Sequence, residues 1–335
     1  MLGLELSFIW AGIIALAVLI YVILDGFDLG VGLLFPLTKD EQERNVMMNS
    51  ISPIWDGNET WLVLGGGGLF AVFPLAYAVV MPALYMPIIL MLLGLIFRGV
   101  AFEYRWRTKR WKPLWDLAFF GGSLVAALCQ GIALGALVQG IEIENRVYAG
   151  GWWDWLTPFS LLTGVAVTVG YAMLGATWLN MKLEGRIQRH MRRLAWPFAL
   201  ATLVFMALVS LWTPFQQAEY FGRWFAWPAM LFSGVVPVLV VLASLGLLQG
   251  LRRQMDVRPF LCAQSLFILG FIGIGISFYP NIVPPSLTIA EAAAPDESLL
   301  FTLVGTLVLL PMILGYTAYA YWVFRGKVDP EEGYH

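Results

Sequence analysis

The sequence has little charge. Only 13% of its 335 residues are Asp, Glu, Lys or Arg, whereas soluble domains average about 25%. Hydrophobic residues make up 59%, and the mean hydropathy is +0.76. This composition excludes an ordinary soluble domain. The net charge of −2 gives no reason to expect a nucleic-acid partner.

Cysteine and histidine are also scarce, with two of each. Cys129 and Cys262 lie in different apolar segments, so no disulfide framework is available. His190 lies in a basic segment and His335 ends the chain, so no imidazole is expected inside the membrane to ligate a haem. There is no Ser/His/Asp set and no cluster of metal-ligating residues. We therefore expect no catalytic centre, metal site or self-ligated haem in this chain. The first apolar stretch lacks a basic start and an A-x-A site, so no cleavable signal peptide is expected.

Long apolar runs are abundant. Residues 61–97 would span about 55 Å as one helix, against a hydrocarbon core of roughly 30 Å, so this run must be a folded-back pair turning near residues 74–82. The runs do not alternate, which favours helices over a barrel. We predict an all-α polytopic membrane protein with a single transmembrane domain, residues 1–335. Its nine spans are expected near residues 7–37, 54–74, 79–101, 115–140, 158–181, 195–214, 226–250, 259–280 and 299–324.

The basic residues are distributed unevenly among the predicted loops. Seventeen of the 20 Lys and Arg fall in alternate loops and the carboxyl-terminal tail, while the opposite loops hold only Arg146 and Arg223. Because Lys and Arg gather on the cytoplasmic side, the amino terminus is expected outside and the carboxyl terminus in the cytoplasm.

Ionisable residues within the predicted spans are few and clustered. Asp25 and Asp28 in DGFDLG, and Asp56 and Glu59 in WDGNETW, are each three residues apart, and Arg98 lies in the third span. A charge at the centre of a membrane helix costs about 2.5 to 3.5 kcal/mol on insertion scales, so each is a functional candidate. All five are expected in the cytoplasmic third of the membrane.

Two interpretations of this cluster remain open. Four carboxylates against one guanidinium would leave a charge of −3 if all were ionised, so at least one carboxyl should be protonated or solvated, as a proton relay requires. The alternative is a buried charge lock that fixes helix packing, or an N-cap provided by Asp56. The two interpretations are compatible with each other. The nearby glycines, including Gly26 and residues 65–68, favour close helix contact, and a broken helix that exposes carbonyls is the alternative.

Three motifs occur in order within the first third of the chain. LDGFDLGVG, NSISPIWDGNETWLVLGGG and FRGVAFEYR together resemble subunit II of the cytochrome bd quinol oxidases. The WDGNETW form is similar to the cyanide-insensitive branch of that family. The resemblance continues through GATWL at residues 175–179, YPNIVPPS at residues 279–286 and the closing YTAYAYWVFRGKV. It covers essentially the whole chain.

The resemblance implies a role in a bacterial inner membrane. In this family subunit I carries the haems b and d and oxidises quinol, while subunit II is a nine-span partner without haem ligands. The complex reduces dioxygen to water with cytoplasmic protons and builds a proton gradient without pumping. Some relatives have a small single-span subunit or a structural quinone in subunit II, and no motif in this sequence determines either. Lipid and quinol are the other partners implied.

The resemblance also assigns roles to residues. Asp25, Asp28, Asp56 and, with least support, Glu59 match the proton inlet on subunit II, with Arg98 as their charge partner. The motif residues around them, expected to be structural, are Gly26, Trp55, Gly57, Asn58 and Trp61. A proton-coupled secondary transporter is the alternative function, although internal repeats and midplane polar groups are typical of that class. A purely structural scaffold for subunit I is a third hypothesis.

Overall fold

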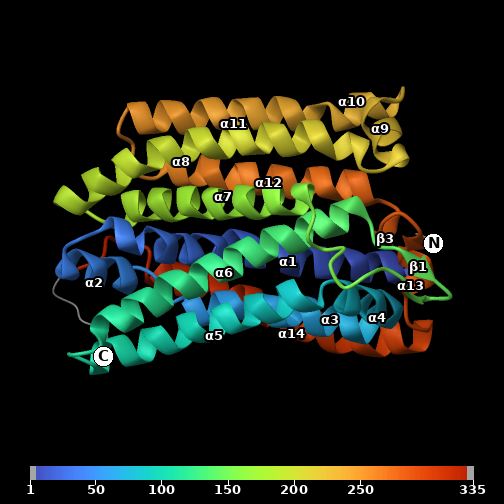
Figure 1. Ribbon diagram of the computed structural model, residues 1–335, viewed down its shortest axis with the longest axis horizontal. Helices are drawn as coiled ribbons and strands as arrows, with labels where there is room; N and C mark the ends of the chain where they lie inside the picture. The colour runs from blue at the N-terminus through green and yellow to red at the C-terminus, as the bar shows by residue number, and fades with distance from the viewer. Residues whose placement is uncertain (1–4, 330–335) are drawn as a thin grey trace.

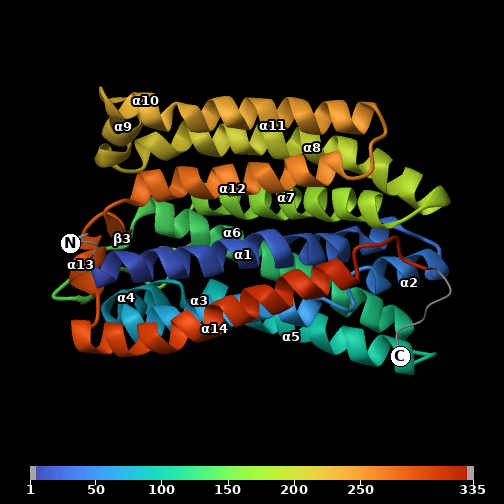
Figure 2. The ribbon, with the colours of Figure 1, turned by 180° about the vertical axis from the view of Figure 1, so that it is seen from behind.

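The long helices lie side by side along the longest axis of the molecule, as the computed structural model of residues 5–329 shows (Figures 1 and 2). Within these residues, eight helices are long and apolar enough to cross a membrane. This confirms an all-helical membrane protein. The eight are α1 (Leu6–Leu34), α5 (Tyr85–Arg107), α6 (Lys112–Gln139), α7 (Pro158–Lys182), α8 (Gly185–Trp212), α11 (Val235–Arg252), α12 (Arg258–Phe278) and α14 (Asp296–Val323).

The predicted second span is helix α3 (Trp55–Val72), but it is not among the eight. Its first turns carry Asp56, Asn58 and Glu59, which lower its hydropathy below that of the others. The expected turn at residues 74–82 is instead a short helix, α4 (Pro74–Ala83), which includes Pro82. The chain changes direction on either side of α4, so the third long helix begins at Tyr85 rather than near residue 79.

Several helices extend beyond the predicted spans. Helix α8 begins at Gly185, ten residues before the predicted start, and α5 continues to Arg107. The apolar windows located only the membrane-compatible part of each helix, because helical hydrogen bonding continues where the side chains become charged. The predicted span at 226–250 is divided into α10 (Ala229–Ser233) and α11.

The connections contain short elements that the sequence did not predict. They are η1 (Phe35–Leu37), α2 (Glu41–Asn49), η2 (Thr213–Phe215), α9 (Ala218–Phe225), α13 (Ile289–Ala292), the hairpin β1 (Ile143–Glu144) with β2 (Val147–Tyr148), and the hairpin β3 (Asn281–Val283) with β4 (Leu287–Thr288). Helix α2 lies at the opposite end of the bundle from the amino terminus (Figure 1). The Asp40 side chain caps it, and Lys112 donates to Glu41 at 2.5 Å, which lowers the pKa of that carboxyl.

Helix α1 lies at the centre of the bundle, between α6 and α7 on one side and α3 and α14 on the other (Figures 1 and 2). Every residue from Asp25 to Leu34 is buried. Gly30 makes the contact with α7 so close that an added Cβ would lie 1.9 Å from the Tyr171 carbonyl oxygen. Glycine in this half of α1 therefore allows close helix contact, as expected. Cys129 and Cys262 are both free thiols.

Candidate functional site

The buried half of α1 carries two carboxyl groups that face a single guanidinium. Arg98 extends from α5, and its Nη1 lies 3.3 Å from Asp25 Oδ1, while its Nη2 lies 3.9 Å from Asp28 Oδ2. Glu59 of α3 accepts a hydrogen bond from Arg98 Nη1. The structure thus brings together four of the five ionisable residues that the sequence singled out. We call Asp25, Asp28, Glu59 and Arg98 the carboxyl cluster.

Burial differs within the carboxyl cluster. The side chains of Arg98, Asp25 and Asp28 are fully buried, whereas 23% of the Glu59 side chain is exposed. If all three carboxyls were ionised, the carboxyl cluster would have a net charge of −2 in a low-dielectric setting. Like charges and desolvation both disfavour that state. The carboxyl cluster can therefore hold an exchangeable proton. Glu59 is the member of the cluster that is exposed at the surface of this chain.

Asn58 and Tyr321 extend the cluster toward α14. The Asn58 side chain is buried and donates from Nδ2 to Asp28 Oδ2 at 2.7 Å. The Tyr321 hydroxyl donates to Asn58 Oδ1 at 3.0 Å. Asn58 was expected only as part of a motif. In the structure its amide connects α3 and α14 to the Asp28 carboxyl. Tyr321 was not predicted, and the signal that could have found it is the tyrosine-rich stretch near the chain's end.

Asp56 lies outside the carboxyl cluster. It is exposed in the first turn of α3, and no ion pair of this residue is found within residues 5–329. Ile54 is the N-cap residue, so the proposed N-cap role of Asp56 is wrong. Its negative charge nevertheless lies at the positive end of a helix dipole. Gly57 next to it has open space around it.

The two tryptophans of the motif support the cluster from different sides. Trp55 stacks on Phe102 with ring centroids 4.7 Å apart, and the Arg98 guanidinium carbon lies 5.9 Å from the Trp55 ring. Trp61 is buried against Tyr21 and Ala17 of α1. Gly26 faces Tyr171, whose ring would lie 2.7 Å from an added Cβ. These contacts fix the positions of α1, α3 and α5 around Arg98.

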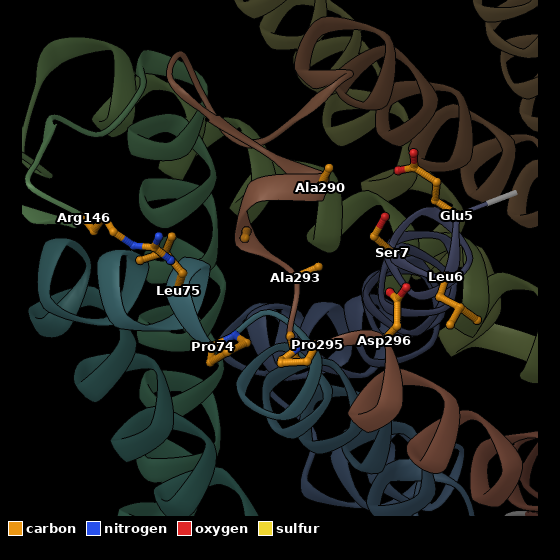
Figure 3. A pocket seen from close by; sticks show the side chains of 12 residues that line it. Glu5, Leu6, Ser7, Pro74, Leu75, Arg146, Ala290, Ala293, Pro295 and Asp296 are labelled. Atoms are coloured by element: carbon orange, nitrogen blue, oxygen red, sulfur yellow. The ribbon is translucent and has the colours of Figure 1, made fainter.

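A separate cavity of about 700 Å³ lies at the amino-terminal ends of α1, α4 and α14 (Figure 3). Arg146, Glu5, Asp296 and the buried Ser7 are among the residues lining it. It lies at the other end of α1, because Ser7 and Asp25 are 18 residues apart along that helix, or about 27 Å. None of the predicted site residues lines this cavity.

Metal-ligating side chains do not gather in one place within residues 5–329. No group of three or more His, Cys, Asp or Glu there could hold a metal ion. His190 lies in the first turns of α8, with Nε2 3.1 Å from the Leu37 carbonyl oxygen. His335 lies outside the described residues.

Comparison with known proteins identifies the family. The family model of cytochrome bd terminal oxidase subunit II matches residues 6–324. Subunit 2 of the cytochrome bd-I ubiquinol oxidase of Escherichia coli (strain K12) is 35% identical over 365 aligned positions, which cover 98% of this chain and 96% of that protein. Cytochrome bd ubiquinol oxidase subunit 2 of Bacillus subtilis (strain 168) is 31% identical, with 97% of both chains covered.

A solved structure shares the fold. A chain of the bd oxidase from Geobacillus thermodenitrificans superposes with a TM-score of 0.77, covering 95% of this chain and 98% of that chain at 18% identity. At that identity the likeness supports the fold alone.

Proposed function

The chain belongs to the family of cytochrome bd terminal oxidase subunit II, and on that premise we propose that it is a haem-free subunit lining the inlet for cytoplasmic protons. As a member of this family it is a subunit of a quinol oxidase complex and a multi-pass protein of a bacterial inner membrane. In the proposed function, the complex reduces dioxygen to water with electrons from quinol. Its protons come from the cytoplasm, so a gradient forms without pumping.

Within residues 5–329, ligation of a haem by histidine inside the bilayer does not fit the residues present. An axial imidazole has to lie inside the bilayer beside the haem, and the described part of the chain offers only His190, among the charged first turns of α8. We therefore assign haem b, haem d and quinol oxidation to the partner, subunit I.

The carboxyl cluster carries the proposal of a proton inlet. One buried guanidinium contacts three carboxyls, of which only Glu59 is partly exposed. Asp56 lies three residues before Glu59 on the exposed turn of α3. In this proposal Asp56 and Glu59 collect protons from water, and the buried Asp25 and Asp28 pass them toward subunit I. Arg98 balances the charge that remains when a proton leaves.

The topology is part of the proposal. Helix α3 would be the ninth span, since its last eleven residues from Leu62 on carry no charge. An odd number of spans agrees with the termini lying at opposite ends of the bundle (Figure 1). Arg105, Lys112 and Arg186 lie at the end that holds α2. That end would be cytoplasmic, with the amino terminus outside.

The proposed contact with subunit I uses α14 and α3. Leu299 is the only buried residue of α14, although the helix is 28 residues long. On α3, Gly66 and Gly67 have no atom within 4 Å of an added Cβ, and such glycine faces suit close helix association in membranes. Packing of subunit I against the exposed faces of α14 and α3 would stabilise that haem-bearing partner.

The experiment is turnover per haem in the intact complex carrying Asp25→Asn, Asp56→Asn or Glu59→Gln. Each change keeps the side-chain volume but removes the exchangeable acid. We expect oxygen consumption per haem to fall at least tenfold, since proton transfer by one side chain contributes about 10²-fold or more. Subunit yield and haem content should persist.

The control is Glu144→Gln, an exposed acid of β1 at the opposite end of the bundle (Figure 1), which should leave turnover unchanged. If the cluster is only a structural lock, yield falls while turnover per haem is retained. Full turnover per haem in all three variants would refute the proton role. A proton-coupled transporter would not copurify with a haem-bearing partner.

A further inference from the structure

The two oxygens of the Asp28 carboxyl have different surroundings. Oδ2 accepts a hydrogen bond from Asn58 Nδ2 at 2.7 Å and lies 3.9 Å from Arg98 Nη2. Oδ1 is buried and, within residues 5–329, accepts no hydrogen bond from another protein group. A positive charge and an N–H donor both oppose a proton on the oxygen that they face. A proton that arrives at Asp28 is therefore favoured on Oδ1.

Tyr321 decides which end of the Asn58 amide faces Asp28. A side-chain amide has one accepting oxygen and one donating nitrogen. The Tyr321 hydroxyl on α14 donates to Asn58 Oδ1 at 3.0 Å, so the Nδ2 end faces Asp28. The Asn58 side chain is buried, and a buried amide oxygen without a donor is costly. The Tyr321 hydroxyl therefore stabilises this orientation of the amide.

The reversed orientation of the Asn58 amide would require a different proton on Asp28. Asn58 Oδ1 would then face Asp28 Oδ2, and two acceptors at this distance are tolerated only when a proton lies between them. That proton would be on Asp28 Oδ2. The Tyr321 proton would lose its acceptor at the same time. The orientation of one amide is thus linked to the position of the proton on the neighbouring carboxyl.

We propose that Tyr321 is a positioning residue of the proton inlet, which holds the Asn58 amide so that the proton carried by Asp28 resides on Oδ1. This inference rests on the proposed function of the carboxyl cluster and deepens it, because it identifies the oxygen through which Asp28 passes protons. Tyr321 acts through Asn58 and does not touch the carboxyl itself. The proposed inlet had no role for either side chain.

The other groups around Asp28 are compatible with this role. The charged and polar side chains that interact with it come from four helices: Asp25 on α1, Asn58 and Glu59 on α3, Arg98 on α5 and Tyr321 on α14. Tyr21 on α1 and Tyr171 on α7 interact with Asp25 instead. Arg98 is the only cation among these groups, and its ion pair with Asp28 is through Oδ2. Arg98 and Asn58 therefore disfavour the same protonated oxygen.

The test is infrared spectroscopy of the intact complex in acidic and neutral buffer, observing the carbonyl stretch of protonated carboxyl groups. The Asp28 band is the one that is lost in Asp28→Asn. In the unaltered complex the carbonyl oxygen of protonated Asp28 is Oδ2, which accepts from Asn58. A carbonyl that accepts a hydrogen bond absorbs at a lower frequency than a free one. The Asp28 band should therefore lie at low frequency.

Tyr321→Phe should move this band to higher frequency. Phe keeps the ring, which packs beside Phe27 and Trp178 with centroids 6.5 and 6.4 Å away, and removes only the hydroxyl. The Asn58 amide can then turn and accept a proton from Asp28 Oδ2, which leaves the carbonyl at Oδ1 without a donor. Oxygen consumption per haem should fall about tenfold, since misplacing a reacting group by about 1 Å can cost about 10²-fold.

Two further variants separate this role from a merely structural one. Asn58→Leu should also raise the frequency of the Asp28 band, and adding Tyr321→Phe to it should cause no further shift, because Tyr321 acts through Asn58. The matched control is Tyr220→Phe, which removes another buried tyrosine hydroxyl, one that donates to the Val138 carbonyl at 3.0 Å. It should leave the band and the turnover unchanged.

Three results would overturn the proposal. They are an Asp28 band that does not move in Tyr321→Phe, a further shift when Tyr321→Phe is added to Asn58→Leu, and the absence of any Asp28 band in acidic buffer. Failure of the proton inlet is a separate result, because it is full turnover per haem in Asp28→Asn. The band reports the orientation of Asn58 whether or not Asp28 contributes to turnover.

Discussion

Replacing Arg98 by Met tests whether one guanidinium holds the carboxyl cluster together. Met keeps much of the side chain's volume and removes its charge. Arg98 pairs with Asp25 at 3.3 Å and Asp28 at 3.9 Å, and it donates a hydrogen bond to Glu59. Removing one partner of a buried pair costs about 3 to 5 kcal/mol, because the remaining charge is uncompensated. We expect the free energy of unfolding of Arg98→Met to be lower by that amount in neutral buffer.

The loss should depend on pH, and its sign follows from the charges. Without Arg98 the buried carboxyls are tolerated only as neutral acids. Protonation in acidic buffer removes the charges, so the deficit should shrink as the pH falls and grow as it rises. The measurement is thermal unfolding of the detergent-solubilised complex at several pH values, with haem retention as the readout.

Arg105→Met is the matched control for this experiment. Arg105 is as deeply buried as Arg98 and is on the same helix, but its partner Asp116 also pairs with Arg44 at 2.7 Å. Removing Arg105 therefore leaves no carboxylate without a cation, and we expect a smaller loss with little pH dependence. Equal losses in the two variants, or a deficit in Arg98→Met that is constant with pH, would contradict this reasoning.

Two other predictions concern packing and topology. Gly30→Ala places a Cβ 1.9 Å from the Tyr171 carbonyl oxygen, about 1.5 Å closer than an ordinary contact. Because α1 and α7 must move apart to accept it, we expect the free energy of unfolding to fall by about 3 kcal/mol or more. The measurement is the unfolding temperature, which should be lower. Gly12→Ala on the same helix has open space and should not destabilise the protein. For topology, reporter fusions in the segment between Arg107 and Lys112 should locate it in the cytoplasm; an outside location would reverse the orientation and the direction of proton supply.

The long helices could be predicted because each apolar run is close to the length of a membrane span. Their ends could not, since a helix continues into charged residues, as α8 does from Gly185. The reversal between α3 and α5 was expected near residues 74–82, with Pro74 and Pro82 at its ends, but no helix was expected within it. Pro74 instead occupies the first turn of α4, where a missing N–H is tolerated.

The carboxyl cluster was predictable because charge is rare in this chain, so the few charged residues within spans had to meet. The position of Asp56 outside the carboxyl cluster was harder to predict. Residues three apart differ by about 60° around a helix, and α3 uses that difference to bury Glu59 more than Asp56. The contacts of Gln130 with Tyr21 and of Tyr321 with Asn58 join residues 109 and 263 positions apart. They depend on how helices pack, which periodicity within one helix does not reveal.

The hydrogen bonding of Arg98 bears on the choice between a structural lock and a proton relay. A buried lock is stable when every donor and acceptor is satisfied. Within residues 5–329, Arg98 Nε and Nη2 make no hydrogen bond to another protein group, and neither Asp25 oxygen accepts one from the protein. A cluster with unused donors and acceptors is a poor lock. It suits a group that changes protonation state, because each proton that arrives or leaves needs a different set of hydrogen bonds. On this argument the substitutions that remove exchangeable acids should affect turnover before they affect assembly.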